Sequence, residues 1–218
     1  MARWRASSFP WPGCSNPATM SKRVCIYCSS SNILESKYRE AAATFARAAS
    51  LLNFTVVCGG SIRGLMGIII DTMLHEQQCG RGKGKVEGVI PRFMGELELH
   101  HTGIDNLVVT DTMSERKELL RKDCDAVVAF PGGLGTLEEL LETLTLKRLG
   151  RFDGVVVLFN QDGFYDKLLE LFDHFVDCKV MNSNYTKGWI VVNTVEELVE
   201  AVCGCTRGTL EIAHYLPI

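Results

Sequence analysis

The run Ala126-Val127-Val128-Ala129-Phe130, followed directly by Pro131-Gly132-Gly133-Leu134-Gly135-Thr136, decides the fold. An unbroken apolar run of this length is typical of a strand that is covered on both faces of a parallel sheet. The proline and the glycines after it indicate a tight turn. The next segment, Leu137–Leu149, has apolar residues at helical spacing. The stretch therefore predicts a strand, a glycine-rich turn and a helix in succession, the unit from which α/β folds are built.

The same alternation continues in both directions along the chain. Other short apolar runs are predicted to be strands: Val24–Tyr27, Thr55–Cys58, Val86–Ile90, Leu107–Thr110, Val155–Phe159 and Ile190–Val192. Segments with helical periodicity lie between them: Tyr38–Leu52, Leu65–Gln78, Ser114–Cys124, Phe164–Cys178 and Val195–Cys203. Thr112 and Thr194 each precede a glutamate by three residues, as in a capping box. Strands that alternate with helices predict right-handed crossovers, and hence a single-domain, Rossmann-like, doubly wound parallel sheet with helices on both faces.

The length of 218 residues fits one domain. Residues 1–19 contain three prolines, two tryptophans and no acidic residue, without periodicity, so we expect a disordered leader there. Residues 20–203 are expected to form the α/β domain. Residues 204–218 are expected to be a C-terminal tail.

Charge and cysteine content limit the partners of this domain. The net charge of −3 and the pI near 6.0 give no basic face for a nucleic acid. No apolar run approaches the roughly 20 residues of a membrane span, so no membrane partner is expected. The nine cysteines are scattered and odd in number, as is typical of reduced thiols in a cytoplasmic protein. Cys25 and Cys28 have the C-x-x-C spacing of metal or redox sites, but in a strand they point to opposite faces, so no metal site is expected.

Three loops that follow predicted strands are glycine-rich or small and polar. They are Cys28–Asn32 (the serine loop, with Ser29), Gly59–Gly64 (the second loop, with Gly60 and Ser61) and Pro131–Thr136 (the glycine loop). Ligands of such sheets bind at the carboxyl ends of the strands. Glycines let the backbone approach an anion, and a following helix presents unpaired N–H groups, so the loops indicate a phosphate site. The alternative is that they are only tight turns.

The common nucleotide-cofactor motifs are missing from these loops. A dinucleotide fingerprint would place G-x-G-x-x-G after the first strand, where this chain has serines. No Gly-Lys-Ser/Thr triplet of a Walker loop ends any of the turns. The sequence therefore predicts no such cofactor.

The helix after the glycine loop is rich in glutamate. Its apolar stripe, expected to pack on the sheet, is made of Leu137, Leu140, Leu141 and Leu144. Glu138, Glu139 and Glu142 are expected on the other side. They could simply complement the helix dipole. A carboxylate one turn above a bound phosphate would instead lie near the sugar of a nucleotide, where it can stabilise an oxocarbenium-like centre or orient a water.

Two cations, Arg116 and Lys117, lie in the first turn of the helix after Thr112. Cations at a helix start oppose its dipole, which suggests a ligand. Arg116 keeps its proton, so the expected role is a planar clamp on phosphate or on a developing charge. The alternative is a solvated pair that partners Glu115 or Glu118.

These motifs together resemble one protein family. The segments Gly59-Gly60-Ser61-Ile62-Arg63-Gly64-Leu65-Met66-Gly67, Gly88-Val89-Ile90-Pro91, Glu115-Arg116-Lys117 and Pro131-Gly132-Gly133-Leu134-Gly135-Thr136-Leu137-Glu138-Glu139 are similar to those of the LONELY GUY (LOG) family. These are cytokinin riboside 5′-monophosphate phosphoribohydrolases. Similar proteins have often been labelled lysine decarboxylases, but the sequence offers no pyridoxal phosphate site.

The resemblance implies hydrolysis of the N-glycosidic bond of an N6-prenylated adenosine 5′-monophosphate, giving free base and ribose 5-phosphate. Arg116 and Glu139 match the family's catalytic residues. Its substrate contacts are matched by Glu98, Lys117, Gly132, Gly133, Leu134, Gly135, Thr136, Leu137, Glu138 and Thr145. The resemblance also implies a homodimer or higher homo-oligomer with the active site near the subunit interface, and no metal or other cofactor.

Two alternatives remain beside this function. One is a general purine or pyrimidine nucleoside 5′-monophosphate nucleosidase without preference for a prenylated base. The other is a protein that binds a nucleotide or a molybdopterin-like cofactor without turnover. The presence of both Arg116 and Glu139 favours an enzyme, because a carrier needs the phosphate loop but not the carboxylate above it.

Overall fold

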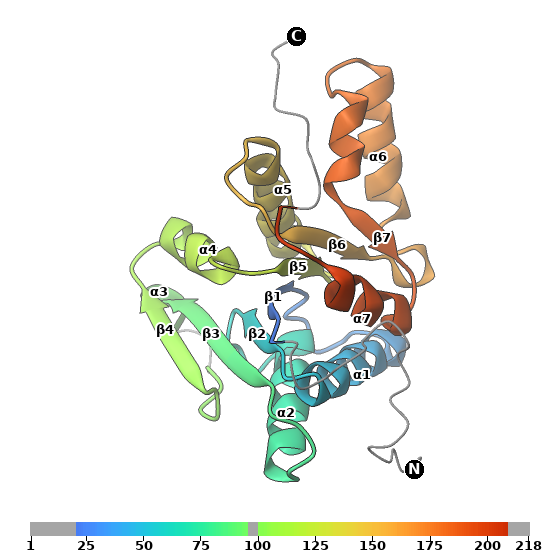
Figure 1. Cartoon of the computed structure of the whole chain (residues 1–218). Helices are drawn as coiled ribbons and strands as arrows, with labels where there is room; N and C mark the ends of the chain where they lie inside the picture. Colours follow the sequence, from blue (N-terminus) through green and yellow to red (C-terminus); the bar gives the residue numbers. More distant parts are fainter. Residues whose placement is uncertain (1–20, 96–99, 209–218) are drawn as a thin grey trace.

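The computed structural model describes residues 21–95 and 100–208, in which seven parallel strands form one sheet (Figure 1). The strands are β1 (Arg23–Tyr27), β2 (Thr55–Cys58), β3 (Lys85–Pro91), β4 (Asn106–Thr110), β5 (Ala126–Ala129), β6 (Val155–Phe159) and β7 (Ile190–Val192). The helices are α1 (Ser36–Leu51), α2 (Gly64–Gln78), α3 (Arg92–Gly95), α4 (Met113–Arg121), α5 (Leu134–Arg148), α6 (Asp166–Asp177) and α7 (Val195–Gly204). Short 3₁₀ turns η1 (Gln161–Gly163) and η2 (Ser183–Gly188) complete these elements.

The strand order is β4-β3-β2-β1-β5-β6-β7, so the chain winds outward from β1 in one direction and then from β5 in the other. β1 pairs with β2 on one side and with β5 on the other. This order is doubly wound, as predicted, and its direction reverses between β1 and β5. A ligand of such a sheet binds at that reversal, next to the carboxyl ends of the strands.

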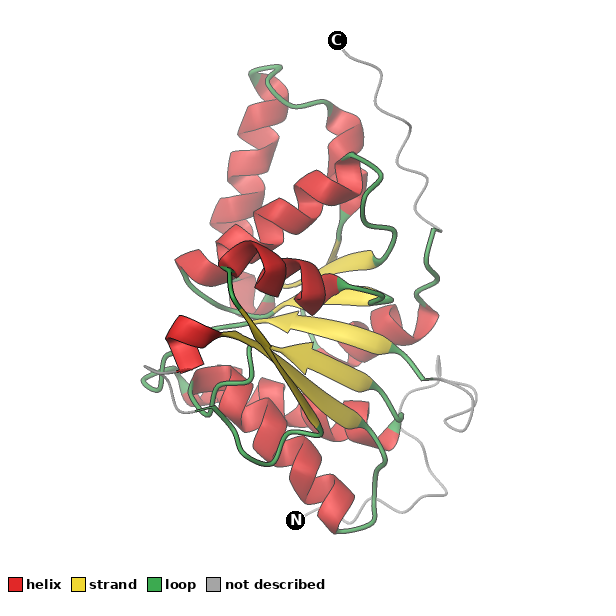
Figure 2. Cartoon of the chain, turned by 90° about the vertical axis from the view of Figure 1, so that its left-hand side faces the viewer, coloured by secondary structure: helices red, strands yellow, loops and turns green. Residues whose placement is uncertain are grey.

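Helices cover both faces of the sheet (Figure 2). Buried residues of α1, α2 and α7, such as Ala42, Ile69 and Leu198, share one core with the strands. Leu120 of α4 and Leu140 of α5 belong to the core on the opposite face. Two separate cores on one sheet are the result of strands whose successive side chains alternate in direction.

The C-x-x-C spacing follows the same alternation. Cys25 belongs to the core under α4 and α5, whereas Cys28 packs against the core under α1 and α2. The two side chains therefore lie on opposite faces, as expected. Among the described residues, seven cysteines are free thiols, namely Cys25, Cys28, Cys58, Cys79, Cys124, Cys178 and Cys205. Cys203 is disulfide-bonded, which corrects the expectation of a reduced thiol at that position.

Helix α5 differs from its prediction in two ways. It begins at Leu134 rather than Leu137, so the last three residues of the glycine loop form its first turn. Of the four predicted stripe residues, Leu140 is buried and Leu137 and Leu144 are partly buried against the same core, while the other buried residues of α5 are the polar Thr136, Thr143 and Lys147. Leu141 is 42% exposed, so the prediction that it packs on the sheet is wrong. Two polar residues can occupy this buried face because they have partners: Lys147 Nζ donates to the carbonyl of Gly154 over 2.6 Å, and the Thr143 hydroxyl donates to the carbonyl of Glu139 over 2.8 Å.

Of the two predicted capping boxes, only one forms in full. Thr194 forms the full capping box with Glu197. Thr112 accepts from the N–H of Glu115, but the Glu115 carboxylate returns to the N–H of Asp111 instead of that of Thr112. The sequence did not predict α3, η1 or η2, each of which is six residues or shorter.

The predicted ends of the domain are described only in part. The leader at residues 1–19 lies outside the described residues, as does the tail beyond residue 208. The domain continues one residue past its predicted end, since α7 ends at Gly204. Within the described ranges, no helix combines the length and apolar character required to cross a membrane.

Candidate active site

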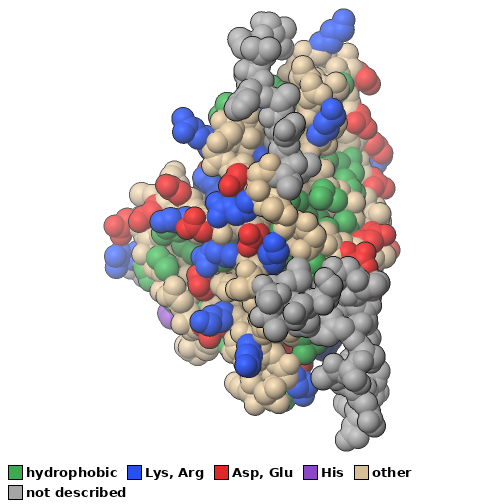
Figure 3. Space-filling view, in the orientation of Figure 1, with side chains coloured by type: hydrophobic (Ala, Val, Ile, Leu, Met, Phe, Trp, Pro, Cys, Tyr) green, Lys and Arg blue, Asp and Glu red, His purple; other side chains and the backbone are tan. Residues whose placement is uncertain are grey.

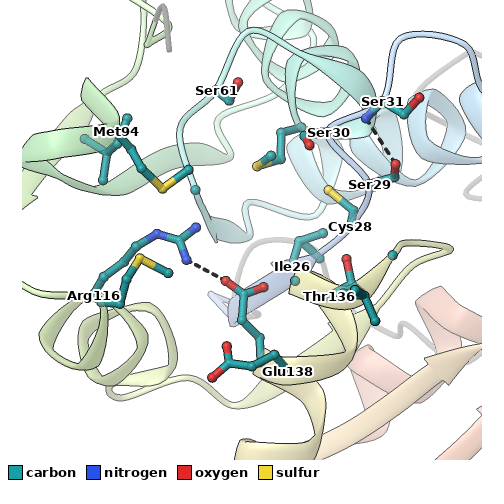
Figure 4. A pocket seen from close by; sticks show the side chains of 18 residues that line it. Ile26, Cys28, Ser29, Ser30, Ser31, Ser61, Met94, Arg116, Thr136 and Glu138 are labelled. Carbon is teal, nitrogen blue, oxygen red and sulfur yellow. Dashed lines mark hydrogen bonds and ion pairs between the residues drawn. The ribbon is translucent and has the colours of Figure 1, made fainter. Parts of the chain in front are cut away.

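The serine loop, the second loop and the glycine loop meet at one cavity of about 390 Å³ at the carboxyl ends of β1, β2 and β5 (Figure 4). Its polar walls are formed by Ser29, Ser30, Ser31, Ser61, Thr136, Arg116, Glu138 and Glu139, together with the backbone of Gly59, Gly133 and Gly135. The cavity lies where the winding of the sheet reverses, which is the position expected for a ligand.

Backbone contacts join the three loops into one unit. Ser29 N–H donates to the carbonyl of Pro131 over 3.2 Å, and the carbonyl of Ser29 accepts from Leu65 N–H over 2.9 Å. Gly64 N–H donates to the side chain of Asn32 over 2.9 Å. Gly64 has a φ of +59°, and an added Cβ would lie 2.3 Å from the Ser29 carbonyl oxygen. Only glycine fits this crossing of the serine and second loops.

The glycine loop presents the amino end of α5 to the cavity. Gly133 is the N-cap residue, and no side chain caps the helix. A Cβ at Gly132 would lie 2.1 Å from Thr136 Oγ1, whereas a Cβ at Gly133 or Gly135 would meet nothing within 4 Å. The loop therefore closes tightly at Gly132 and leaves open space at the next two glycines. Uncapped N–H groups beside such space form an anion site.

Arg116 and Glu139 form a buried ion pair in the cavity wall, drawn as a dashed line in Figure 4. Arg116 Nη1 donates to Glu139 Oε1 over 2.6 Å, and the two side chains are 10% and 12% exposed. Arg116 Nε donates to the carbonyl of Val89 over 3.1 Å. A Cβ at Gly59 would lie 2.6 Å from Arg116 Nη2, so this glycine makes room for the guanidinium. Three elements thus fix the orientation of the pair.

Burial determines the direction of the pKa shift of the Glu139 carboxyl, even though the Arg116 cation lies beside it. It raises the pKa of Glu139 above the ordinary glutamate value, and the nearby Arg116 guanidinium offsets the rise only in part. A charge that is held in a poorly solvated site is strongly stabilised by an opposite charge that develops next to it.

The α4–α5 ladder, made of Lys117, Arg121, Glu138 and Glu142, continues the ion pairing behind Glu139. Lys117 Nζ pairs with both Glu138 and Glu142, and Arg121 Nη2 lies 2.8 Å from Glu142 Oε1. The alternative partners for the two cations, Glu115 and Glu118, were therefore wrong. The glutamates of α5 balance the cations of α4. This explains why Arg116 and Lys117 can both lie in the first turn of α4.

The predicted site residues fall into three groups. Those that line the cavity are Ser29, Ser61, Arg116, Gly133, Leu134, Gly135, Thr136, Glu138 and Glu139. Those that lie outside its wall are Gly60, Lys117, Gly132, Leu137 and Thr145. Thr145 is exposed further along α5, and its hydroxyl donates to the carbonyl of Leu141. Glu98 lies outside the described residues.

Apolar residues complete the cavity and were not predicted. They include three methionines, Met66, Met94 and Met113, with Ile26 and Ile90. Met94 lies on the same side as Arg116 and across the cavity from Ser29, Ser30 and Ser31 (Figure 4). No signal in the sequence distinguishes these residues from core residues, because their apolar character fits both places.

Comparisons with known proteins identify the relatives of this chain. A family model described as "Possible lysine decarboxylase" matches residues 66–202. Cytokinin riboside 5′-monophosphate phosphoribohydrolase LOG4 of Arabidopsis thaliana is 36% identical over 189 residues, 85% of this chain and 85% of that protein. LOG2 of the same species, with the same activity in its name, is 38% identical over 156 residues, 72% of this chain and 70% of that protein.

One solved structure has a similar fold. The molybdenum cofactor carrier protein of Chlamydomonas reinhardtii superposes with a TM-score of 0.60 and covers 84% of this chain and 96% of its own. Its sequence identity is 17%, so this likeness shows the fold alone. The family model and the two Arabidopsis relatives extend over most of the chain, and on their evidence the chain belongs to the LOG family.

Proposed function

We propose that the protein hydrolyses the N-glycosidic bond of a cytokinin riboside 5′-monophosphate and releases the free base and ribose 5-phosphate. The observation that carries the proposal is the buried Arg116–Glu139 pair, which shares one cavity with the uncapped amino end of α5. The names of the relatives LOG4 and LOG2 support the same reaction.

The 5′-phosphate is assigned to the glycine loop. Backbone N–H groups of Gly133, Leu134 and Gly135 lie at the start of a 15-residue helix, where the dipole favours an anion. The Thr136 hydroxyl and the serine loop line the same end of the cavity. Hydrogen bonds to a charged phosphate are about twice as strong as those to a neutral group. The loop therefore supplies most of the binding energy.

The ribose carbon C1′ is assigned to the space beside Glu139, one turn further along α5. When the C1′–N bond breaks, its electron pair leaves with the base and C1′ becomes oxocarbenium-like. The Glu139 carboxylate stabilises this positive charge and orients the attacking water. The water oxygen bonds to C1′, and the proton it loses is balanced by the proton that the departing base gains. Arg116 holds the carboxylate in place through its bond over 2.6 Å.

The base is assigned to the methionine side of the cavity. Met66, Met94 and Met113 present flexible, polarisable surfaces, which adapt to a flat aromatic base and to an apolar substituent on it. Of these three, Met94 lies on the same side of the cavity as Arg116 and opposite the serine loop (Figure 4).

Two other functions fit the described residues less well. A lysine decarboxylase of the pyridoxal phosphate type needs a lysine for its Schiff base, and no lysine is among the described residues that line the cavity. A cofactor carrier without turnover would need the anion site but not a buried carboxylate with a raised pKa beside it.

A homodimer is part of the proposal, and so is a cytoplasmic location, which the seven free thiols of the described residues support although Cys203 is disulfide-bonded. Leu134 and Leu141 of α5 and its C-cap residue Leu149 are 86%, 42% and 51% exposed, and helical spacing places them on the same side as Thr145. An apolar stripe of this kind on a surface helix fits a second copy of the chain. Thr145 would then contact the substrate of the neighbouring subunit rather than that of its own.

The test is chromatographic detection of free base and ribose 5-phosphate from a panel of nucleoside monophosphates, with and without an N6-prenyl group. We expect release from the prenylated AMP, and loss of at least a hundredfold in rate for Glu139→Gln, since one transition-state interaction of this kind contributes about 3 kcal/mol. Arg116→Lys should be similarly impaired because a point charge cannot replace the planar fork. Binding of the monophosphate without release of base would favour a carrier instead.

A further inference from the structure

Two buried tyrosine hydroxyls lie directly behind the cavity wall. Tyr27 is the last residue of β1, and Tyr165 precedes α6. Their side chains are 1% and 2% exposed, and neither lines the cavity. A buried hydroxyl without a partner would be costly, so its choice of partner is informative. Each of these two bonds to a segment that carries candidate site residues.

Tyr165 holds the start of the glycine loop. Its hydroxyl donates to the carbonyl of Phe130 over 2.6 Å, and its own N–H donates to Asn160 Oδ1 over 2.6 Å. β5 ends at Ala129, so the Phe130 carbonyl lies beyond the strand, and the next residue, Pro131, opens the loop. The Tyr165 phenol therefore fixes the first peptide of the loop to the segment that follows β6.

Tyr27 holds the turn of α5 that carries Glu139. Its hydroxyl lies 3.0 Å from Thr143 Oγ1, and the Thr143 hydroxyl donates to the carbonyl of Glu139 over 2.8 Å. Threonine has one hydroxyl proton, and Thr143 donates it to the Glu139 carbonyl. Tyr27 is therefore the donor in its bond to Thr143 Oγ1. Burial raises the pKa of both tyrosines, so each phenol stays a donor at neutral pH. The central strand is thus connected to Glu139 through one buried hydroxyl relay.

We propose that Tyr165 and Tyr27 are positioning residues that separately fix the two halves of the site. Tyr165 sets the glycine loop for the phosphate, and Tyr27, through Thr143, sets the carboxylate of Glu139 for the reaction. The proposed role of Tyr27 rests on the proposed hydrolysis. The proposed role of Tyr165 is tested by ribose 5-phosphate binding alone, so the two roles can fail independently.

The experiment measures turnover and ribose 5-phosphate affinity for both phenylalanine variants. Tyr165→Phe should weaken ribose 5-phosphate binding, measured by calorimetry, roughly tenfold, because one buried carbonyl loses its partner. Tyr27→Phe should lower kcat roughly tenfold and leave that affinity within about twofold. Tyr38→Phe is the matched control. It removes a tyrosine hydroxyl from α1, where the ring packs on Phe164, and should change neither quantity.

The relay itself has a second test. Thr143→Val should reproduce the kcat defect of Tyr27→Phe, and the double variant should be no worse than either single one, because both break the same chain. Thr143→Ser keeps the hydroxyl and should retain turnover. A purely structural role would lower the melting temperature of all these variants without this pattern of rescue.

The outcomes separate the proposals. If both tyrosine variants match the wild type, or lose affinity and turnover in equal proportion, the division of roles is overturned. If the wild type binds ribose 5-phosphate but hydrolyses no nucleotide, the proposed function and the Tyr27 role fall, while a loss of affinity confined to Tyr165→Phe still supports the phosphate half. A wild type that binds no ribose 5-phosphate overturns the phosphate half.

Discussion

At the scale of single residues, the Glu139 carboxyl combines burial with one strong partner. Its pKa is raised by desolvation, and Arg116 offsets this only in part. A carboxylate in water is already stabilised by its solvent, so it gains little from a nearby positive charge. In the proposed reaction, the same carboxylate inside this wall gains more when the ribose becomes cationic. Glu139 would then stabilise the transition state more than the ground state.

The raised pKa predicts the pH dependence of turnover. Glu139 must be ionised to act, and its pKa lies above the ordinary value of 4.5, so activity falls as the pH drops through the raised value. We expect the acid limb of kcat/KM to have its midpoint above pH 4.5. Glu118→Gln, which removes an exposed glutamate of α4, should keep the same limb. Full activity down to the ordinary glutamate value would exclude Glu139 as the group that titrates.

The glycine loop gives a second prediction at this scale. Gly132→Ala should destabilise the fold by about 1–3 kcal/mol, since its Cβ would overlap Thr136. Gly135→Ala has free space and lies in a helix, so it should keep or raise stability by about 0.5–1 kcal/mol. Its methyl group would nevertheless occupy the phosphate position and raise KM. Thermal unfolding measures the effect on stability, and steady-state kinetics measure the effect on KM. An unchanged KM for Gly135→Ala would mean that the phosphate binds elsewhere.

At the scale of elements, the α4–α5 ladder sets the distance between the helices that carry Arg116 and Glu139. Burial raises the pKa of Glu142, but Lys117 and Arg121 more than offset it, and the net pKa is lowered. A lowered pKa contributes stability that is present above the unfolded value, about 4.3, and is lost as the pH falls through the folded value.

Glu142→Gln is therefore expected to lower stability at pH 7 by about 1 kcal/mol. The difference from the wild type should shrink as the pH falls from about 4.3 through the lowered pKa of folded Glu142, because below that pKa both chains are neutral at this position. Glu170→Gln removes one partner of an exposed ion pair with Lys167 and is the matched control, with no comparable change. Denaturant unfolding at several pH values measures this. A difference that stays constant with pH would mean that the carboxylate charge contributes nothing.

Prediction from sequence succeeded for elements with a strong periodic pattern. The strand Val155–Phe159 was predicted with the bounds it has, because its five apolar residues lie between Gly154 and Asn160, both of which favour turns. The start of α5 was missed by three residues, since Gly135 reads as a turn residue although it lies in the first helical turn. Its buried face was predicted in part, since Leu140 is buried but Leu141 is exposed. Thr143 and Lys147 look like surface residues until Tyr27 and the Gly154 carbonyl are seen to partner them.

The candidate site was predictable in its polar part only. Arg116 stood out because a cation at a helix start opposes the dipole, and the glycine loop because of its glycines, whereas Glu139 was singled out from its neighbouring glutamates only by the resemblance to the LOG family. The partner of Arg116 lies 23 residues away along the chain, so no local pattern indicated the ion pair. The methionine side could not be predicted at all, because Met66 and Met94 resemble core residues.

At the scale of the whole molecule, the reversal of strand order brings loops that are about 100 residues apart to one edge of the sheet, as the contact of Ser29 with Pro131 shows. On the face shown in Figure 3, acidic and basic side chains are interspersed. A field of mixed sign does not attract a polyanion, but it leaves local sites free to bind a small one.

The homodimer can be tested at this scale. Leu141→Lys should convert a dimer to a monomer in light scattering, because it places a charge in the proposed apolar interface on α5. Leu171→Lys changes a residue of α6 with nearly the same exposure, 44% against 42%, and should leave the assembly unchanged. A Leu141→Lys protein that keeps the mass of the wild type would place the interface on another face.

The most direct measurement of the central claim is kcat/KM for AMP, for its N6-prenylated derivative and for adenosine. Remote binding energy at the glycine loop holds C1′ against Glu139, so loss of the 5′-phosphate should lower both affinity and the chemical rate. We predict that both monophosphates exceed adenosine by at least a hundredfold, since the charge-assisted bonds at α5 contribute about 1.5–3 kcal/mol each. Hydrolysis of adenosine and AMP with equal kcat/KM would contradict the assignment of the glycine loop and the reaction proposed from it.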